Sequence, residues 1–227
     1  MKSVDKVTVA QLYLMLLGML YITFMYSSAV LTSKIILFGH SVTLAGVFMV
    51  PIVFSLSDIV AELYGYRVAK ILVLTAFGCQ ILFGVICAIF IRLPSPSSWH
   101  GEASYQFVLG PLFRISIGSF LAYIFSSLLN VYFISRWKIT LKGRYFWLRS
   151  IGASTLGEFF FTVMAVFFIQ YGKLPTTVIL QIIMTSYLVK LCLSVLNSVW
   201  ATVIVVFAKA KIGEYSESKV DLFSPFK

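Results

Sequence analysis

The amino-acid sequence predicts an all-α membrane protein: a polytopic bundle of six transmembrane helices forming a single domain over residues 1–227. Hydrophobic residues make up 60% of the chain, and its mean hydropathy is +0.97. Only 11% of the residues are charged, too few to cover a water-soluble surface of this size. Because a helix needs roughly 20 apolar residues to cross a bilayer, the 227 residues hold about six spans with short loops.

The lengths of the apolar runs, with the charged and turn residues between them, place the six helices. Periodicity contributes little, because helices that are hydrophobic all round lack an amphipathic stripe. The first run follows Lys2 and Lys6, as a secretory signal would, and Ser27 and Ala29 have the spacing of a cleavage site. The run is longer than the apolar region of a signal peptide, so we expect it to remain as a helix. The expected helices are at about 8–31, 43–65, 68–91, 108–135, 149–171 and 179–208.

The basic residues predict the topology. Thirteen Lys and Arg residues fall on the side that holds both termini, and three (Lys34, Arg92 and Lys173) fall on the other side. The remaining two, Arg114 and Lys190, lie within spans. Since cytoplasmic loops are enriched in Lys and Arg, both termini are expected in the cytoplasm, which requires an even number of helices. The expected location is the cell inner membrane, with several passes.

The composition also excludes other classes of function. The net charge of +10 lies mostly in loops between apolar runs, so no surface for direct nucleic-acid binding can be assembled. Cys79, Cys87 and Cys192 sit singly in apolar stretches, and His40 and His100 lie far apart, so no metal or other cofactor is expected. The sequence has no P-loop, HExxH or GxSxG motif, and we do not expect an enzyme.

Five ionisable residues lie inside the apolar spans: Asp58, Glu62, Arg114, Glu158 and Lys190. A charge within a membrane helix costs on the order of 3 kcal/mol on insertion scales, and such residues usually mark a pathway or a binding site. The structural alternative is that the charges pair as salt bridges or reach the membrane interface. Arg114, near a helix end, suits the interface best.

The expected helix 43–65 carries Asp58 and Glu62 one turn apart and therefore on one face. Two carboxylates at this spacing repel each other in a low dielectric, so one is expected to be protonated or matched by a base. Pro51 precedes them and is expected to kink the helix and free a carbonyl group. The alternative is an interfacial acidic pair that meets Arg67 and Lys70.

The expected helix 108–135 carries a polar stripe. Ser119, Tyr123, Ser127 and Asn130 recur every three or four residues and share one face. In a membrane such a stripe either serves helix packing or lines a cavity, and the pattern fits both. Arg114 at the outer end has the charge to neutralise an acid or bind an anion.

The last two expected helices carry charges near mid-membrane. Ser154 and Glu158 share a face, and Glu158 lies about nine residues past Arg149, roughly 13 Å along a helix. Lys190, with Tyr187 beside it, lies about a dozen residues from the outer end of its helix. A Glu158–Lys190 pair would neutralise both charges, and it would suit a structural contact, a gate or part of a binding site.

A set of motifs runs through nearly the whole chain in order. It comprises VFSLSDIVAELYGYRVAK at residues 53–70, RISIGSFLAY at residues 114–123, the run from Ser154 to Glu158, and Tyr187 with Lys190. In sequence and spacing this set resembles the queuosine-precursor transporter family, also called the vitamin uptake transporter family.

The resemblance implies import of a 7-deazaguanine such as preQ0, preQ1 or queuine for queuosine modification of transfer RNA. It also implies a bundle similar to the substrate-binding components of energy-coupling-factor transporters. The chain departs from the family at Ala29, where Asn is frequent, at Ser127 and Asn130, where the family has Gln and Asp, and at Glu158, where Asp is usual. The carboxylate lost at Asn130 favours a different deazapurine, or queuine over a smaller precursor.

A 7-deazaguanine suits the polar residues of the spans. Its N1–H and N2–H2 donors match a carboxylate, its carbonyl group accepts from Arg, Lys or Asn, and its flat ring stacks on tyrosine. Glu158 or Asp58 is expected to take the base edge, and the other polar groups to orient it. The candidate substrate-binding residues are Asp58, Glu62, Arg114, Tyr123, Asn130, Ser154, Glu158, Tyr187 and Lys190.

Several mechanisms and two rival functions remain open. Transport by facilitated diffusion with metabolic trapping, by proton coupling through Asp58, Glu62 or Glu158, or through a separate energising module all fit, as does a homodimer. One rival is an intramembrane metal-dependent enzyme that acts on a lipid-linked substrate through Asp58 and Glu62, although two-metal enzymes need a denser acid cluster. The other is a structural subunit in which Glu158 and Lys190 are dispensable.

Overall fold

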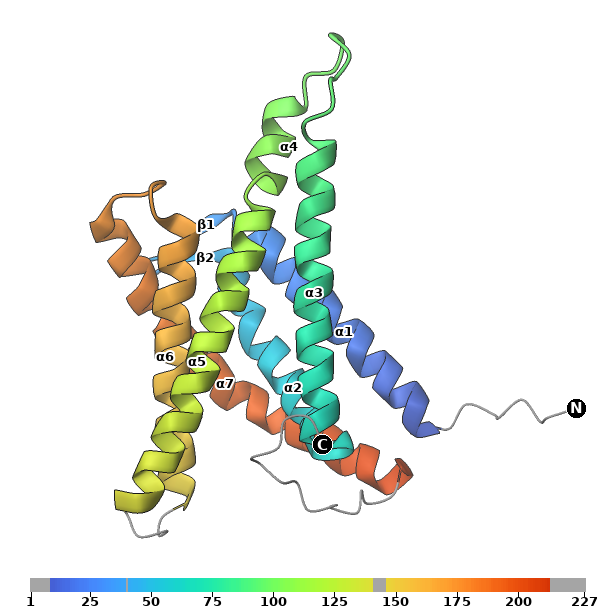
Figure 1. The fold of residues 1–227 in the computed structure, drawn as a ribbon, viewed down its shortest axis with the longest axis vertical. Coiled ribbons are helices and arrows are strands. Elements are labelled where there is room, and N and C mark those ends of the chain that lie inside the picture. Colours follow the sequence, from blue (N-terminus) through green and yellow to red (C-terminus); the bar gives the residue numbers. More distant parts are fainter. Residues whose placement is uncertain (1–8, 40, 141–145, 213–227) are drawn as a thin grey trace, which may run out of the picture.

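A computed structural model describes residues 9–39, 41–140 and 146–212. The described chain is mostly helical, with one short β-hairpin near its N-terminal third (Figure 1). In chain order the elements are α1 (Val9–Leu31), β1 (Ile35–Phe38), β2 (Ser41–Leu44), the 3₁₀ helix η1 (Ala45–Phe48), α2 (Val50–Tyr64), α3 (Tyr66–Phe90), α4 (Glu102–Leu109), α5 (Leu112–Thr140), α6 (Phe146–Gln170) and α7 (Thr176–Ile212).

Five stretches of the described chain are long and apolar enough to cross a membrane. Large apolar side chains such as Met19, Leu82 and Leu188 are exposed on the outside of the bundle, where lipid tails would cover them. The chain is therefore a multi-pass membrane protein. The apolar stretch of α6 within the described residues, Thr155–Gln170, is shorter than these five, so a sixth span stays a prediction. The five stretches are Val9–Leu31, Ala45–Tyr64, Arg67–Phe90, Glu102–Ser127 and Thr176–Asn197.

The connections between the helices gather at two opposite ends of the bundle. The start of α1, the α2–α3 turn and the C-terminal ends of α5 and α7 lie at the lower end in Figure 1, and the hairpin and the α3–α4 and α6–α7 connections lie at the upper end. Basic residues at the lower end include Arg67 and Lys70 at the start of α3, Arg149 near the start of α6, and Lys209 and Lys211 at the end of α7. Lys34, Arg92 and Lys173 belong to the upper connections. We call the lower end the basic end.

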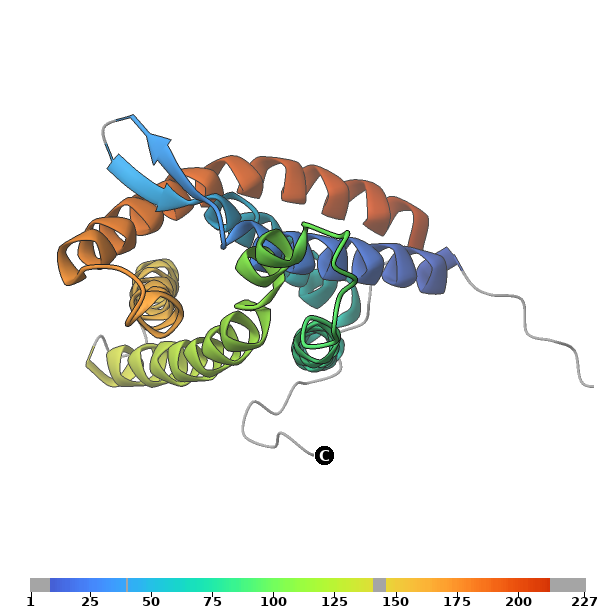
Figure 2. The same ribbon diagram turned by 90° about the horizontal axis from the view of Figure 1, so that it is seen from above.

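The segment before α2 differs from the sequence prediction. Residues 43–48, expected as the first turns of a helix, form part of β2 and the 3₁₀ helix η1. β1 and β2 pair in antiparallel register, with Ile35 opposite Leu44, and Gly39 in the turn has a φ of 62°. Isoleucine, valine and threonine side chains favour extended backbone, which local apolar patterning alone does not distinguish from helix. The hairpin lies alongside α7 (Figure 2).

The predicted kink at Pro51 is wrong. Pro51 lies in the first turn of α2, where the missing N–H has no helical partner to lose. At this position the missing N–H leaves no carbonyl group of α2 without a partner, because α2 begins at Val50. Pro51 therefore starts the helix instead of bending it.

The expected helix 108–135 is divided. Residues up to Leu109 belong to α4, and α5 begins at Leu112, after Gly110 and Pro111. Pro111 lacks the N–H that would continue the α4 hydrogen-bond ladder, and its carbonyl group accepts from the Ile115 N–H at 2.9 Å to begin α5. The other helix ends lie within a few residues of their predicted positions.

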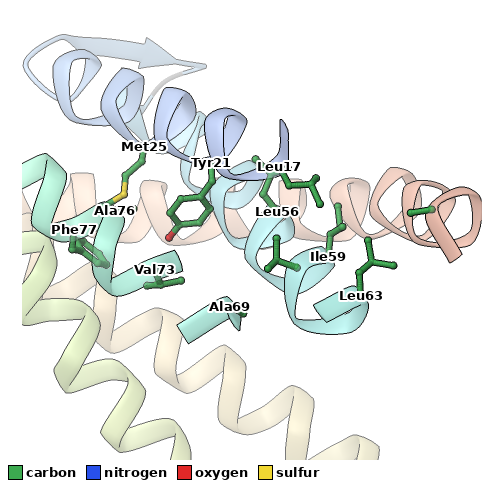
Figure 3. Close-up of a cluster of buried hydrophobic side chains, with 12 residues drawn as sticks. Leu17, Tyr21, Met25, Leu56, Ile59, Leu63, Ala69, Val73, Ala76 and Phe77 are labelled. Atoms are coloured by element: carbon green, nitrogen blue, oxygen red, sulfur yellow. The ribbon is translucent and has the colours of Figure 1, made fainter. Parts of the chain in front are cut away.

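Two of the clusters of buried side chains pack the helices against one another. Buried side chains of α1, α2, α3 and α7 form one cluster (Figure 3), which includes Tyr21, Ile59, Val73 and Phe77. α5 packs along α6 and also contacts α3. Phe161 of α6 belongs to a second buried cluster, with Ile115 and Ala122 of α5 and Ala29 of α1.

A single glycine makes the turn between α2 and α3. Gly65 has φ 85° and ψ 160°, a conformation that is essentially restricted to glycine. Its N–H donates to the Ala61 carbonyl group at 2.9 Å and so closes the last turn of α2. The reversal of the chain at the basic end depends on this residue.

Gly65→Ala is expected to destabilise the protein by about 1–3 kcal/mol, because the added Cβ strains the backbone of this turn. Thermal unfolding in detergent measures the effect. Gly78→Ala in α3 is the matched control: an added Cβ meets nothing within 4 Å, so Tm should stay equal or rise. Equal Tm values for Gly65→Ala and the unmodified protein would contradict a strained turn.

Candidate functional site

A cavity of about 80 Å³ lies between α1, α2, α3, α5 and α6, and we call it the central cavity. This equals the liquid volume of two or three water molecules at about 30 Å³ each, and typical ligand sites start at about 300 Å³. A two-ring ligand therefore enters only when side chains move apart. The lining residues are Tyr21, Met25, Ser28, Ala29, Thr32, Val50, Val53, Phe54, Ser57, Val73, Phe77, Gln80, Ile115, Ser119, Tyr123 and Phe161.

Aromatic rings form much of the cavity wall. Phe77 of α3 packs against Tyr123 of α5 with ring centroids 5.2 Å apart. Phe54 of α2 meets Phe161 of α6 edge to face, with centroids 5.9 Å apart and an interplanar angle of 83°. Tyr21 adds a ring from α1. Such walls offer several ring faces and edges to a flat ligand.

Three of the hydroxyl groups that line the cavity already donate their protons to the backbone. Ser28 donates to the Gly46 carbonyl group at 3.0 Å, and Thr32 donates to the Ser28 carbonyl group at 2.8 Å. Ser57 donates to the Phe54 carbonyl group at 2.7 Å. These three side chains retain acceptor lone pairs but have no proton left for a ligand.

Gln80 of α3 is the cavity residue that the sequence analysis missed. Its side chain is only 3% exposed, and its Oε1 atom has no hydrogen-bond partner among the described residues. An unpaired buried amide oxygen costs about 1–3 kcal/mol, so it marks a place where a partner is expected. The sequence does distinguish Gln80 in one respect, because it is the single Asn or Gln residue of α3. The sequence analysis considered mainly charged residues within the spans and did not select it.

Lys190 of α7 is buried behind the cavity wall. It is 3% exposed, and its Nζ donates to Thr162 Oγ1 at 3.0 Å. The same Nζ lies 4.7 Å from the centroid of the Phe161 ring, a favourable cation–π contact. Phe161 therefore both lines the central cavity and contacts a buried ammonium group.

Glu158 lies one turn before Thr162 on α6, and its Oε1 atom is buried without a hydrogen-bond partner in the described structure. The predicted Glu158–Lys190 neighbourhood exists, since the two charges lie close enough to interact. The hydrogen bond of Lys190 goes to Thr162 instead of to the carboxylate, and Thr162 in turn donates to the Glu158 carbonyl group at 2.8 Å. The Thr162 hydroxyl group thus connects Lys190 to the backbone of Glu158.

Asp58 and Glu158 lie one turn from the Phe54–Phe161 contact on two different helices. α2 runs toward the basic end and α6 runs away from it (Figure 1). Asp58 follows Phe54 by four residues and Glu158 precedes Phe161 by three, so both acids lie one turn from the Phe54–Phe161 contact, on the side of the basic end. Glu62 lies one further turn along α2, and both Asp58 and Glu62 are exposed.

Tyr187 packs between α6 and α7 and is not among the cavity-lining residues. Its ring meets Phe159 edge to face at 5.2 Å, and its hydroxyl group approaches the Thr155 carbonyl oxygen at 3.5 Å. The neighbouring Ser186 hydroxyl group lies 3.1 Å from that of Thr43 and ties α7 to the hairpin. This part of α7 therefore contributes to helix packing.

Arg114 caps the end of α6. Its Nε donates to the Phe168 carbonyl group at 2.8 Å, and its Nη2 donates to the Tyr171 carbonyl group. These carbonyl groups at the end of α6 have no helical N–H to accept from, and a cation stabilises that end of the helix dipole. Lys173 follows in the loop, where partial burial and the Arg114 charge lower the pKa of its ammonium group.

Of the nine candidate residues, Tyr123 lines the central cavity, and Glu158, Tyr187 and Lys190 gather beside it on α6 and α7. Asp58 and Glu62 occupy α2 toward the basic end, and Arg114 lies at the opposite end. The side chains of Asn130 and Ser154 lie outside the described residues.

A multi-pass helical bundle around a small cavity with aromatic walls is the architecture of a membrane transporter for a small molecule. A sequence profile described as the putative vitamin uptake transporter matches residues 44–205, and the chain belongs to that family. The predicted resemblance is thereby confirmed, and the rival interpretation as an intramembrane enzyme has no support.

Two named relatives are similar to the chain over most of its length. The chain is 30% identical to the "Probable queuosine precursor transporter" of Bacillus subtilis (strain 168) over 166 residues, which cover 73% of this chain and 72% of the relative. It is 26% identical to the "Queuosine precursor transporter" of Escherichia coli (strain K12) over 155 residues, or 68% of this chain and 66% of the relative. No solved structure matches.

Arg114→Gln is expected to lower the stability of the protein by about 0.5–1.5 kcal/mol through the lost α6 cap, and to leave ligand affinity unchanged. Thermal unfolding and ligand binding in detergent measure the two effects separately. Lys173→Gln removes a neighbouring positive charge without removing the cap and serves as the control. A loss of affinity without a fall in Tm would contradict a capping role.

Proposed function

We propose that this protein imports a queuosine precursor, a 7-deazaguanine such as queuine, preQ1 or preQ0, through the central cavity. The observation that carries the proposal is a cavity between the helices that has aromatic walls and a buried, unpaired amide oxygen at Gln80. Such a site suits a flat bicyclic base, which stacks on rings and presents hydrogen-bonding edges. The names of the two relatives support the same class of substrate.

The proposed orientation has six spans in the cell inner membrane, with the basic end in the cytoplasm. The division of Lys and Arg residues between the two ends of the bundle supports it. Both termini then lie in the cytoplasm, and the substrate leaves the central cavity toward the basic end.

The Phe54–Phe161 contact is the proposed barrier on this exit route. The two rings come from separate helices and meet edge to face with their centroids 5.9 Å apart. Lys190 stabilises the closed position, because its ammonium group lies against the Phe161 ring. Asp58 and Glu158 follow one turn beyond the barrier, where their carboxylates suit the donor groups of a departing base or its ammonium substituent.

The driving force can be separated with purified protein in vesicles. Facilitated diffusion equilibrates labelled substrate without a gradient, whereas proton coupling through Asp58, Glu62 or Glu158 makes accumulation depend on an inward proton gradient. Transport that appears only in cells would indicate an energising module. Cross-linking in the membrane detects a homodimer.

Ser119→Phe is expected to reduce uptake of labelled queuine or preQ1 to background, because the added ring fills a cavity of about 80 Å³. Uptake is measured in cells that lack their own precursor transporter. Leu121→Phe, two residues further along α5 on an exposed face, adds a ring outside the cavity and should preserve uptake. Uptake by the unmodified protein at the level of an empty vector would refute the proposed function.

Phe161→Ala is expected to open the barrier toward the basic end. The reporter is a cysteine at Ser28, which lines the cavity level with Gly46 and therefore lies on the far side of the barrier from the basic end. In a protein whose three native cysteines are replaced by Ser, this cysteine should then react severalfold faster with a membrane-impermeant thiol reagent in inside-out vesicles. Phe167→Ala, at an exposed position of the same helix, is the control. Equal reaction rates in the two variants would remove Phe161 as the barrier.

A further inference from the structure

Gln80 stands apart from the other polar groups of the central cavity. The hydroxyl protons of Ser28, Thr32 and Ser57 are bonded to backbone carbonyl groups, whereas the Gln80 Oε1 atom lacks any partner within the described structure. A buried amide oxygen in an apolar bundle reduces stability unless something binds it. The unmet acceptor therefore points to a ligand that brings a donor.

The backbone that carries Gln80 is held in place from a second helix. The Ser116 hydroxyl group of α5 lies within hydrogen-bonding distance of both the Gln80 carbonyl oxygen, at 3.2 Å, and the Leu112 carbonyl oxygen, at 2.7 Å. One turn further on, a Cβ at Gly84 would come within 2.9 Å of the Phe113 Cα, so α3 and α5 are in close contact there. Gln80 thus projects from a rigid junction, and rigid placement lowers the entropic cost of binding.

We propose that Gln80 recognises the lactam edge of the transported base. Its Oε1 accepts from the ring N–H, and its Nε2 donates to the neighbouring ring carbonyl group. A primary amide presents an acceptor beside a donor in one plane, and a lactam presents the complementary pair, so two parallel hydrogen bonds form. This inference rests on the proposed function and identifies the side chain that forms hydrogen bonds with the substrate.

The assignment defines which ligands the cavity accepts. Deazapurines that share the lactam but differ in the substituent on the five-membered ring present the same edge to Gln80. A base without the ring N–H and carbonyl group leaves the amide unpaired and binds more weakly, because a site built for a hydrogen bond rejects a ligand that cannot make it. Gln80 therefore selects ligands by the hydrogen-bonding groups of the six-membered ring.

A comparison of two ligands and two protein forms tests the proposal. The ligands are 7-deazaguanine and 2-amino-7-deazapurine, which lacks the carbonyl group and the N–H of the six-membered ring. The unmodified protein is expected to prefer 7-deazaguanine by about 10- to 100-fold. Gln80→Met keeps a similar length without hydrogen-bonding groups and should reduce that preference to less than about threefold. Binding is measured on purified protein in detergent.

Thermal unfolding and a second substitution test whether a lost ligand preference comes from misfolding or from any Gln→Met change. Gln80→Met removes an unpaired buried oxygen, so its Tm should equal or exceed that of the unmodified protein. Gln106→Met, at an exposed glutamine of α4, should keep the full preference for 7-deazaguanine. A Gln80→Met protein that retains the preference, or that weakens for both ligands equally, would overturn the role of Gln80 while leaving the proposed function intact. Failure of the unmodified protein to bind either base would overturn both.

Discussion

Lipid tails offer no hydrogen-bond partners, so every polar group inside this bundle has to be met by the protein itself. Serine and threonine side chains meet the constraint by donating to carbonyl groups, either one turn back, as Ser55 does, or on a neighbouring element, as Ser28 does. Such bonds use the polar groups for packing and leave little free for a ligand. Three buried side-chain atoms of the described residues lack a partner, on Gln80, Glu158 and Asn197, and Gln80 is the one of these three residues that lines the central cavity.

Aromatic packing determines the volume of the central cavity. The rings of Phe54, Phe77, Tyr123 and Phe161 meet one another around the central cavity and reduce it to a volume smaller than a two-ring base needs. Phe161 carries a second contact, because the Lys190 ammonium group lies against its ring. Movement of one ring therefore changes both the space for a ligand and the surroundings of a buried charge, and this links binding to the charged residues of α6 and α7.

The sequence predicted the proximity of Glu158 and Lys190, but it did not predict the contacts of Arg114 or the burial of Gln80. Glu158 and Lys190 are neighbours as predicted, but Thr162 takes the hydrogen bond of Lys190, an arrangement that depends on the rotation of two helices about their axes. Arg114 looked like a ligand-binding cation, yet its guanidinium group reaches the carbonyl groups at the end of α6. Gln80 went unnoticed because an isolated neutral amide is an ordinary residue until burial leaves it unpaired.

The sequence by itself determined that this is a multi-pass helical membrane protein, which family it resembles, and closely where most of its helices lie. These properties follow from composition, the lengths of apolar runs and ordered motifs, all of which are local to the chain. The tertiary structure alone decided that residues 43–48 join a hairpin and a 3₁₀ helix, that α2 and α6 bring their aromatic rings together, and that Gln80 borders the cavity. The physical reason is that helices which are apolar on every side carry no sequence signal for the face that turns inward, so contacts between helices select it.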